Sequence, residues 1–303
     1  MTTISVLIPT FRRAESFLRA ARSVLAQRVD ANIELIAVDN SPEGSAIHAF
    51  RAIARRSPSF GWDHEPAPGV ANARNAALAL ARGDFIAWLD DDEEAPPTWL
   101  AAMLDVITVT NADCVFGPVH ARAPENTPRG AYYEQLYTRL GPNTSGAITQ
   151  SYGIGNSMQR RDFFAGAAPF DPRANETGGE DDRLFAEARA RGARFAWAAE
   201  AVVLEHIDPA RANLRHALKR AFAFGQGPCE TAWRERDMPT LARHMSIGLG
   251  QALVFGAGAI VAFAALRPNA ARLLDRAARG AGKVLWFWQR RFYGARLAAR
   301  QPA

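Results

Sequence analysis

The first 120 residues alternate short apolar runs with segments of helical periodicity, and this rhythm constrains the fold more than any other feature of the chain. Four apolar runs have the length and composition of buried strands: ISVLIP (4–9), IELIAVD (33–39), FIAWLD (85–90) and ADCVFGPV (112–119). Four segments between or after them place apolar residues at helical spacing: 14–28, 43–56, 69–82 and about 97–110. This alternation predicts an α/β fold, with a doubly wound, mostly parallel sheet covered by helices on both faces.

The rest of the chain carries weaker signals. Residues 120–180 are rich in Pro, Gly, Asn and Tyr, which predicts loops around a short helix near 131–139. A further helix is expected over 177–191, where acids precede apolar residues at helical spacing. The two cysteines lie far apart without metal-ligand spacing, so neither a disulfide nor a zinc framework is expected, which suits a reducing compartment. Because strand-like sequence begins by Ile4, no secretory signal peptide is expected.

Two acidic clusters are the strongest chemical signal. Five consecutive acids, 90–94, follow the third predicted strand, and Asp39 ends the second. In doubly wound sheets ligands bind at the carboxyl ends of the strands, so these carboxylates are expected in one site. Asp90 and Asp92 can point to the same side and hold Mg²⁺ or Mn²⁺, which prefer oxygen ligands. In the second cluster, 180–182, Asp181 could act as a general base.

Five motifs occur in order over roughly residues 3–230: VLIPTFRR, VDNSP, GVANARNAAL, FIAWLDDD and GGEDDRLF. Together they resemble the family 2 inverting glycosyltransferases of GT-A fold, a nucleotide-diphospho-sugar transferase fold. The closest likeness is to bacterial exopolysaccharide glucosyltransferases of the succinoglycan type. The resemblance implies transfer of a sugar from a nucleotide-sugar donor, UDP-linked by default, in one in-line displacement.

The resemblance also implies roles for single residues. The residues implied at the nucleotide donor are Pro9, Thr10, Arg13 (or Arg12), Asp39 at the base, Gly69, Arg74, Asp90 and Asp91. Asp90 and Asp92 would form the DxD pair that holds a divalent metal, with His206 as a candidate third ligand. Asp181 would be the catalytic base, and Glu180 beside it would hold acceptor or donor hydroxyls.

Each of these residues also has a purely structural interpretation. Carboxylates in the first turn of a helix are favoured by its dipole, by about 0.3–1 kcal/mol each, without any catalytic role. The alternatives residue by residue are a turn cap for Asp39, a surface charge for Arg74, solvated neighbours for Asp91, Glu93, Glu94 and Asp182, a structural strand end for His206, and a turn residue for Asn156, which otherwise matches an acceptor-side loop.

The C-terminal third differs from the rest in charge and hydropathy. Residues 206–303 carry 14 Arg and 2 Lys against 5 acids, a net charge of +11, which leaves −6 for residues 1–205. Residues 245–266 are uncharged and long enough to span a bilayer. The basic tail beyond them argues against one span from a cytosolic domain, so an interfacial or re-entrant helix pair is expected, with 283–296 at the headgroups. A soluble helical hairpin is the alternative.

These observations predict a catalytic domain over 1–230 and a helical, basic, membrane-associated region over 231–303. The expected function is a metal-dependent inverting glycosyltransferase at the cytoplasmic face of the inner membrane, acting on a lipid-linked or polysaccharide acceptor. Its expected partners are the nucleotide sugar, the acceptor and an anionic membrane surface. The alternatives are a catalytically silent sugar-nucleotide- or glycan-binding subunit and a nucleotidyl- or phosphotransferase. Nucleic-acid binding rests only on the basic pI and is not expected.

Overall fold

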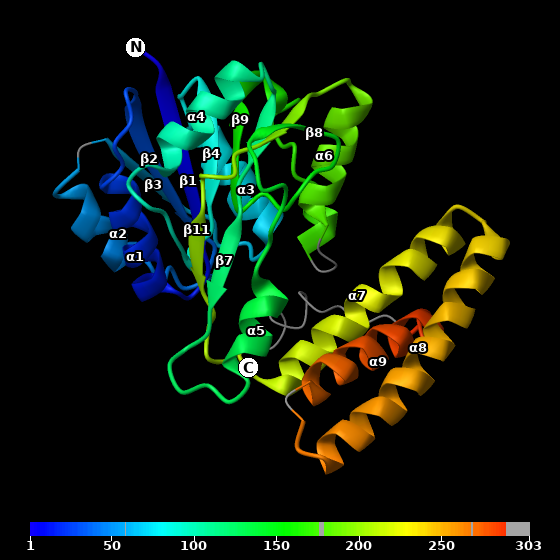
Figure 1. Cartoon of the computed structure of the whole chain (residues 1–303). Coiled ribbons are helices and arrows are strands. Elements are labelled where there is room, and N and C mark those ends of the chain that lie inside the picture. Colours follow the sequence, from blue (N-terminus) through cyan, green and yellow to red (C-terminus); the bar gives the residue numbers. More distant parts are fainter. Residues whose placement is uncertain (58, 176–178, 268, 289–303) are drawn as a thin grey trace. The chain divides into compact units, whose positions relative to one another are not determined.

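The computed structural model describes residues 1–57, 59–175, 179–267 and 269–288 (Figure 1). The chain forms two compact units, each assembled from two segments. The sheet unit comprises 1–121 and 137–206, and the helical unit comprises 122–136 together with the chain from 207 onward. The predicted domain boundary at residue 230 falls inside helix α7 (Leu214–Arg234).

The sheet unit contains an eight-stranded mixed sheet with the order β3-β2-β1-β4-β9-β6-β10-β8. Its strands are β1 (Thr3–Thr10), β2 (Asn32–Asp39), β3 (Phe60–His64), β4 (Phe85–Leu89), β6 (Cys114–Phe116), β8 (Gly146–Ile148), β9 (Asn156–Arg160) and β10 (Phe195–Trp197). Strand β9 runs antiparallel to both of its neighbours, and β8 runs antiparallel to β10. A smaller sheet has the order β5-β11-β7, built from β5 (Glu93–Glu94), β11 (Val203–His206) and β7 (Val119–Arg122).

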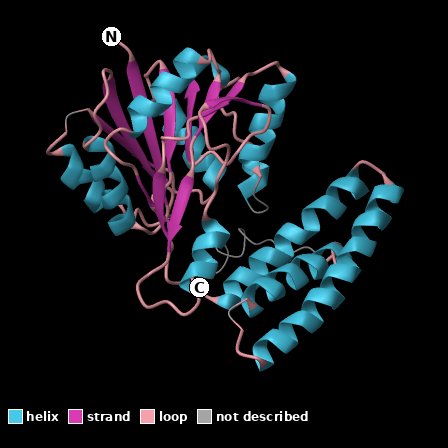
Figure 2. Ribbon diagram, in the orientation of Figure 1, coloured by secondary structure: helices cyan, strands magenta, loops and turns pink. Residues whose placement is uncertain are grey.

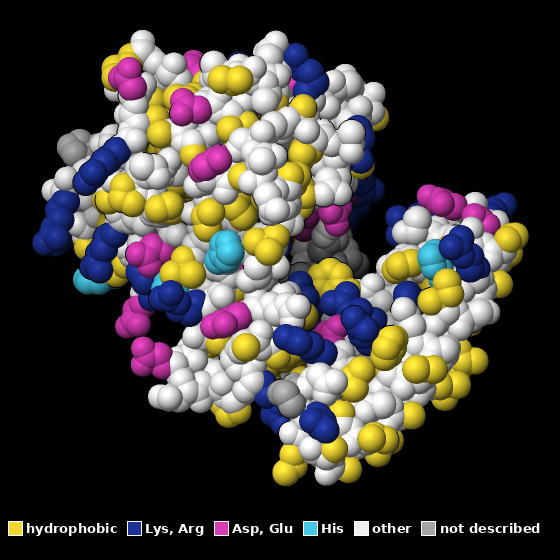
Figure 3. All heavy atoms as spheres, in the orientation of Figure 1, with side chains coloured by type: hydrophobic (Ala, Val, Ile, Leu, Met, Phe, Trp, Pro, Cys, Tyr) yellow, Lys and Arg dark blue, Asp and Glu magenta, His cyan; other side chains and the backbone are white. Residues whose placement is uncertain are grey.

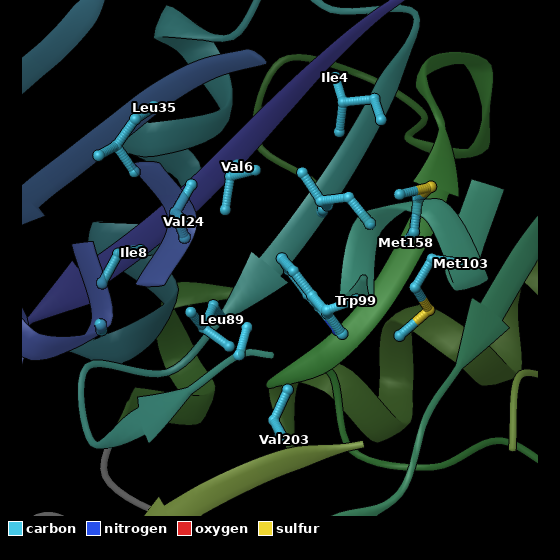
Figure 4. Packing of buried hydrophobic residues seen from close by; sticks show 14 of the residues in the cluster. Ile4, Val6, Ile8, Val24, Leu35, Leu89, Trp99, Met103, Met158 and Val203 are labelled. Carbon is cyan, nitrogen blue, oxygen red and sulfur yellow. The ribbon is translucent and has the colours of Figure 1, made fainter. Parts of the chain in front are cut away.

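Helices cover both faces of the large sheet, as predicted (Figure 2). Helices α1 (Ala14–Leu25), α2 (Ile47–Ala54) and α4 (Trp99–Val109) contribute to the hydrophobic core on one face, and α3 (Val70–Leu80) and α6 (Glu180–Ala190) to the core on the other. Along β1, Ile4, Val6 and Ile8 enter the first core (Figure 4), whereas Leu7 enters the second, because successive side chains of a strand point to opposite faces. Full burial of such a side chain contributes about 1.5–3 kcal/mol.

The predicted parallel strands are confirmed, whereas two sequence interpretations are wrong. The run 112–119 is two strands rather than one: it breaks at Gly117-Pro118, and β6 and β7 belong to different sheets. Proline has no N–H to donate to a continuing ladder, which ends the first pairing there. Residues 120–180 are not only loops, because they contain β8 and the central strand β9, of whose five residues all but Arg160 are buried. Strands β3 and β10 were not predicted from the sequence either.

The helical unit consists of α7, α8 (Met238–Ala264) and α9 (Ala270–Val284), together with most of α5 (Gly130–Tyr137). Helix α9 packs along both α7 and α8. The phenol of Tyr132 on α5 donates to Asp275 Oδ1 on α9 at 3.3 Å. By length and composition α8 alone, among the described helices, could cross a membrane. The predicted headgroup segment 283–296 lies outside the described residues beyond Trp288.

Candidate active site

Four chain segments meet at one edge of the large sheet. Strands β1 and β2 end in register at Thr10 and Asp39. Strand β4 ends at Leu89, which pairs with Asn156 at the start of the antiparallel β9. The carboxyl ends of the parallel strands therefore share this edge with the amino end of β9 and the turn before it. This is the edge at which doubly wound sheets bind ligands.

The acid cluster after β4 folds inward, and Arg13 is its principal cation. One nitrogen of Arg13, Nη1, donates to Asp91 Oδ1 at 3.0 Å and to Asp92 Oδ2 at 2.8 Å. The hydroxyl of Thr10 donates to the other oxygen of Asp91 at 2.7 Å. Burial raises the pKa of Asp91 to about 6, against the opposing effect of Arg13. The interpretation of Asp91 as a solvated neighbour is therefore wrong.

Glu93 is buried as well, which corrects a second assignment to solvent; only Glu94 of the pair is exposed. The Glu93 carboxylate accepts a hydrogen bond from the Asp90 backbone N–H at 3.1 Å and lies 3.4 Å from Arg139 Nη2. Burial and the charge of Asp90 raise the pKa of Glu93 well above its usual value, whereas Arg139 lowers it. Glu93 thus holds the backbone of the DxD segment and anchors a cation beside it.

The turn before β9 brings Asp90 and Arg139 into the site because it contains two glycines. A Cβ on Gly155 would overlap the Asp90 carboxylate, and a Cβ on Gly153 would overlap the Arg139 guanidinium. Burial raises the pKa of Asp90; Arg74 and Arg139 oppose this shift, and the nearby carboxylates Asp92 and Asp181 add to it. Asp90 lies against Gly155, and the N–H of the preceding Ile154 donates to Asp181, so this turn brings the two acidic clusters of the sequence together.

Arg74 and Glu180 form a buried ion pair, so Arg74 is not a surface charge. The guanidinium also lies 5.8 Å from the ring centroid of Phe170. Burial raises the pKa of Glu180, whereas Arg74 lowers it. Because Glu180 is the first residue of α6, the pair ties the amino end of α6 to α3.

Asp181 occupies the first turn of α6, half-buried, and points toward the glycine turn. The backbone N–H of Ile154 donates to its Oδ2 at 3.3 Å, and that of Asp182 donates to its Oδ1 at 3.0 Å. Asp182 itself is exposed, as the structural alternative predicted.

Asp39 is fully buried, and the local backbone satisfies its carboxylate. It accepts hydrogen bonds from the N–H and hydroxyl of Ser41 at 2.9 and 2.7 Å, and from the N–H of Ala46 at 2.5 Å. These are the bonds of a turn cap, the structural alternative for this residue. A contact of Asp39 with the nucleotide base stays a prediction, as does one of the half-buried Pro9.

Gly69 opens α3 with a φ of +152°, a conformation that favours glycine. Its N–H donates to Asn40 Oδ1 at 2.6 Å, and a Cβ there would overlap the side chain of Asn175. Asn175, the last residue of a short 3-10 helix (Pro172–Asn175), caps α3 by accepting from the Ala71 N–H at 2.9 Å. Neither Asn175 nor Arg139 was predicted from the sequence; for Arg139, the two glycines of SYGIGN were the available sign of a close approach.

His206 lies at the end of β11 with its ring Nε2 3.0 Å from Glu94 Oε2, and its backbone N–H donates to the Asp92 carbonyl at 2.8 Å. Within the residues that the structure describes, no three His, Cys, Asp or Glu side chains converge as a preformed metal site. A ligand role of His206 stays a prediction. Asn156 is structural: its amide bonds Trp99 Nε1 and two backbone carbonyls.

Comparison with known proteins places this geometry in a family. The family model "Glycosyl transferase family 2" matches residues 5–166. The succinoglycan biosynthesis protein ExoM of Rhizobium meliloti is 32% identical over 227 residues, which cover 74% of this chain and 73% of ExoM. The putative colanic acid biosynthesis glycosyl transferase WcaA of Escherichia coli is 33% identical over 102 residues, 33% of this chain and 36% of WcaA.

Solved structures share the fold. Residues 1–349 of TarS from S. aureus superpose with a TM-score of 0.53 at 14% identity, covering 72% of this chain and 64% of that one. GalNAc-T7, solved with UDP, GalNAc and Mn²⁺, gives a TM-score of 0.53 at 16% identity, covering 68% of this chain and 44% of that one. This chain thus spans less than two thirds of either structure. By its family match, its similarity to ExoM and its sheet, the chain belongs to glycosyl transferase family 2 and has the GT-A fold.

Proposed function

We propose that the chain transfers a sugar from a nucleotide-diphosphate donor, UDP-linked, to a lipid-linked or polysaccharide acceptor, with inversion at the anomeric carbon. The observation that carries this proposal is the pairing of charges in the site. Arg13 binds Asp91 and Asp92, Arg139 binds Glu93, and Arg74 binds Glu180.

Asp90 and Asp181 differ from Asp91, Asp92, Glu93 and Glu180, each of which pairs with an arginine. In the described part of the chain, no guanidinium lies within hydrogen-bond distance of either carboxylate. Asp90 is close enough to Asp181 for the two charges to affect each other. The site therefore offers one carboxylate suited to a cation and one suited to a proton, which are the two groups that an inverting transfer needs.

The residues fit a divalent metal. Asp90 and Asp92 offer hard oxygen ligands, and Mg²⁺ is usually held by one or two carboxylates with substrate phosphates and water completing its shell. The raised pKa of Asp90 reflects a buried carboxylate among other carboxylates, an environment that a cation would relieve. We propose that Asp90 and Asp92 hold the metal and that His206 is a further candidate ligand. When bound, the metal would neutralise charge on the departing diphosphate.

Asp181 would accept the proton of the acceptor hydroxyl as the new bond forms. The Ile154 N–H fixes the orientation of its Oδ2, and the buried pair of Arg74 and Glu180 fixes the first turn of α6. One base is sufficient, because a single displacement forms no covalent sugar–enzyme intermediate. We assign Glu180 to positioning this turn, in addition to its expected contact with sugar hydroxyls.

The relatives support the donor and acceptor classes. TarS has been solved with UDP, and GalNAc-T7 with UDP and Mn²⁺. ExoM belongs to succinoglycan biosynthesis. On this basis we place the nucleotide beside Pro9, Thr10, Arg13, Asp39, Gly69, Arg74 and Asp91, and the reaction at the cytoplasmic face of the membrane, as the sequence predicts.

The test is nucleotide release by the full chain from a panel of nucleotide sugars, with Mn²⁺, Mg²⁺ or EDTA and with lipid-linked and glycan acceptors. We expect release from one donor, abolished by EDTA. Asp181→Asn should lower kcat about 10²–10⁴-fold while donor binding persists, since a general base contributes that much. Asp92→Asn should weaken donor binding in the presence of metal. Asp182→Asn, which alters the exposed neighbour, is the matched control and should retain activity.

Two results would contradict the proposal. If Asp181→Asn turned over as fast as the parent, Asp181 could not be the catalytic base. Metal-dependent binding of a nucleotide sugar without turnover for any acceptor would instead indicate the silent binding subunit that the sequence left open.

A further inference from the structure

Helix α8 turns its large aliphatic side chains outward. Four of these side chains are between 64% and 73% exposed: Leu253, Val254, Ile260 and Val261. Ile247, which is also exposed, lies on the same face two turns before Val254. Leu253 and Ile260 are seven residues apart, as are Ile247, Val254 and Val261 in turn, so the five side chains recur every two turns and form one stripe. Figure 3 shows hydrophobic side chains in a band along this helix. Exposed apolar patches of this kind mark an interaction surface.

The inward face of α8 is small or polar instead. Gly248 approaches the backbone of Gly280 on α9 so closely that a Cβ on either glycine would overlap the other helix. Gln251 accepts a hydrogen bond from Lys283 Nζ at 2.8 Å. Bulky aliphatics outside and small or polar residues inside reverse the pattern of a helix in a water-soluble bundle, where the apolar stripe faces the core. The outward stripe is therefore built for an apolar partner.

Helix α9 determines how α8 can meet that partner. The uncharged run is bracketed by Arg243 and Arg267, and Phe255 lies midway between them. The Arg276 guanidinium of α9 lies 5.2 Å from the ring centroid of Phe255. If α8 crossed a bilayer in this packing, α9 would carry charges to its centre, where ionised side chains are rare and costly.

The charge of the helical unit indicates the kind of partner. Its described residues from 207 onward carry 12 Arg and Lys against 5 Asp and Glu. Near the beginning of α8, the rings of Trp233 and Trp286 lie 5.3 Å apart and line a hollow together with Arg234 and Arg236. Arginine beside tryptophan suits the headgroup level of a membrane.

We propose that α8 lies in the surface of an anionic bilayer, with its outward stripe among the acyl chains and both of its ends on the same side, and does not cross the membrane. This deepens the membrane-partner part of the proposed function, but it involves neither the metal nor the base. Vesicle binding is therefore measured without donor or turnover, so its failure and the failure of the proposed chemistry are distinguishable.

The first test is flotation of the full chain with vesicles containing phosphatidylglycerol or only phosphatidylcholine. We expect binding to the anionic vesicles, reduced by salt. Leu253→Glu and Ile260→Glu should each weaken it by more than about tenfold, because an inserted carboxylate is strongly disfavoured. Val109→Glu, which alters an even more exposed aliphatic residue of α4, is the matched control and should bind as the parent does. Absence of vesicle binding would overturn the proposal.

A second copy of the chain is the competing occupant of the stripe. Light scattering would then show a dimer that Leu253→Glu splits, with vesicle binding unchanged, and this result would also overturn the proposal.

The second test decides the topology. Cysteines introduced by Arg243→Cys and Arg267→Cys bracket the stripe, while the native Cys114 and Cys229 are buried. In inverted membrane vesicles of the expression host, a membrane-impermeant maleimide should label both introduced positions, and in spheroplasts it should label neither. Labelling of one position from each side would show that α8 crosses the membrane and would refute the proposed arrangement.

Discussion

Replacing Arg74 by methionine would leave Glu180 as a buried carboxylate without its cation. The Arg74 and Glu180 side chains are only 8% and 7% exposed. An exposed ion pair contributes about 0–1 kcal/mol, whereas removal of one partner from a buried pair costs about 3–5 kcal/mol. Methionine keeps most of the apolar stem that packs near Phe170, so the lost charge dominates. We expect Arg74→Met to lower the free energy of unfolding by about 3–5 kcal/mol near pH 8.

The cost should shrink as the pH falls. Burial already raises the pKa of Glu180, and loss of Arg74 removes the principal opposing effect. A carboxyl group whose folded pKa is raised contributes stability below its unfolded pKa and loses that contribution as the pH rises through the folded value. In Arg74→Met, Glu180 would therefore take up a proton in mild acid, and the variant should approach the parent there.

Urea unfolding followed by circular dichroism, at mildly acidic pH and near pH 8, measures both effects. Arg82→Met, at an exposed arginine just beyond the same helix, is the control and should change stability by less than about 0.5 kcal/mol. The double variant Arg74→Met with Glu180→Leu should recover much of the loss, because no stranded charge remains. A cost below about 1 kcal/mol that does not depend on pH, or a double variant whose cost is the sum of the two single ones, would refute the reasoning.

Three further outcomes are expected. The pKa of Asp91 is about 6 in the folded protein and 3.8 for an ordinary aspartate, so its protonated form contributes at most about 3 kcal/mol to stability, which is lost as the pH rises through about 6. Asp91→Asn should therefore flatten the fall in the urea midpoint between mild acid and pH 8. Gly155→Ala should displace Asp90 and weaken Mn²⁺ binding in the presence of UDP more than about tenfold by calorimetry, and unchanged affinity would contradict this. Asn156→Ala should strand buried partners, Trp99 among them, and cost about 3 kcal/mol in urea unfolding; a loss under about 1 kcal/mol would argue against it.

The parallel half of the fold was predictable because its signals are local. Each buried strand from β1 to β4, except β3, is a short apolar run, and each helix between them has helical spacing. Strand β9 lacks such a run: Asn156, Ser157 and Gln159 are polar and yet buried. Their hydrogen-bond partners include Trp99 and Cys114, more than 40 residues away, so no local pattern could reveal that burial.

The candidate site, like the fold, was predictable only in part. The motifs located Asp90, Asp92 and Asp181, and the structure brings these carboxylates to one edge of the sheet. The choice of which carboxylate each arginine binds depends on tertiary approach and was not predictable. Arg139 reaches Glu93 across 46 residues of chain, and the sequence around Glu93 resembles a solvated acidic loop. The proximity of Arg139 to the DxD segment follows from the glycine turn before β9, whose function is visible only in three dimensions.

The two-segment construction of the helical unit has a consequence for the order of folding. Every segment of the sheet unit has been synthesised once residue 206 is made. Helix α5, by contrast, cannot pack until its partner α9 has been synthesised, and the hydrogen bond between Tyr132 and Asp275 closes a loop of 143 residues. Closing so long a loop is entropically costly until the intervening chain is ordered. Because domains generally fold as they are synthesised, the sheet unit should form first and α5 should dock last. A nascent chain halted before α9 would therefore be expected to contain a folded sheet and an unpartnered α5.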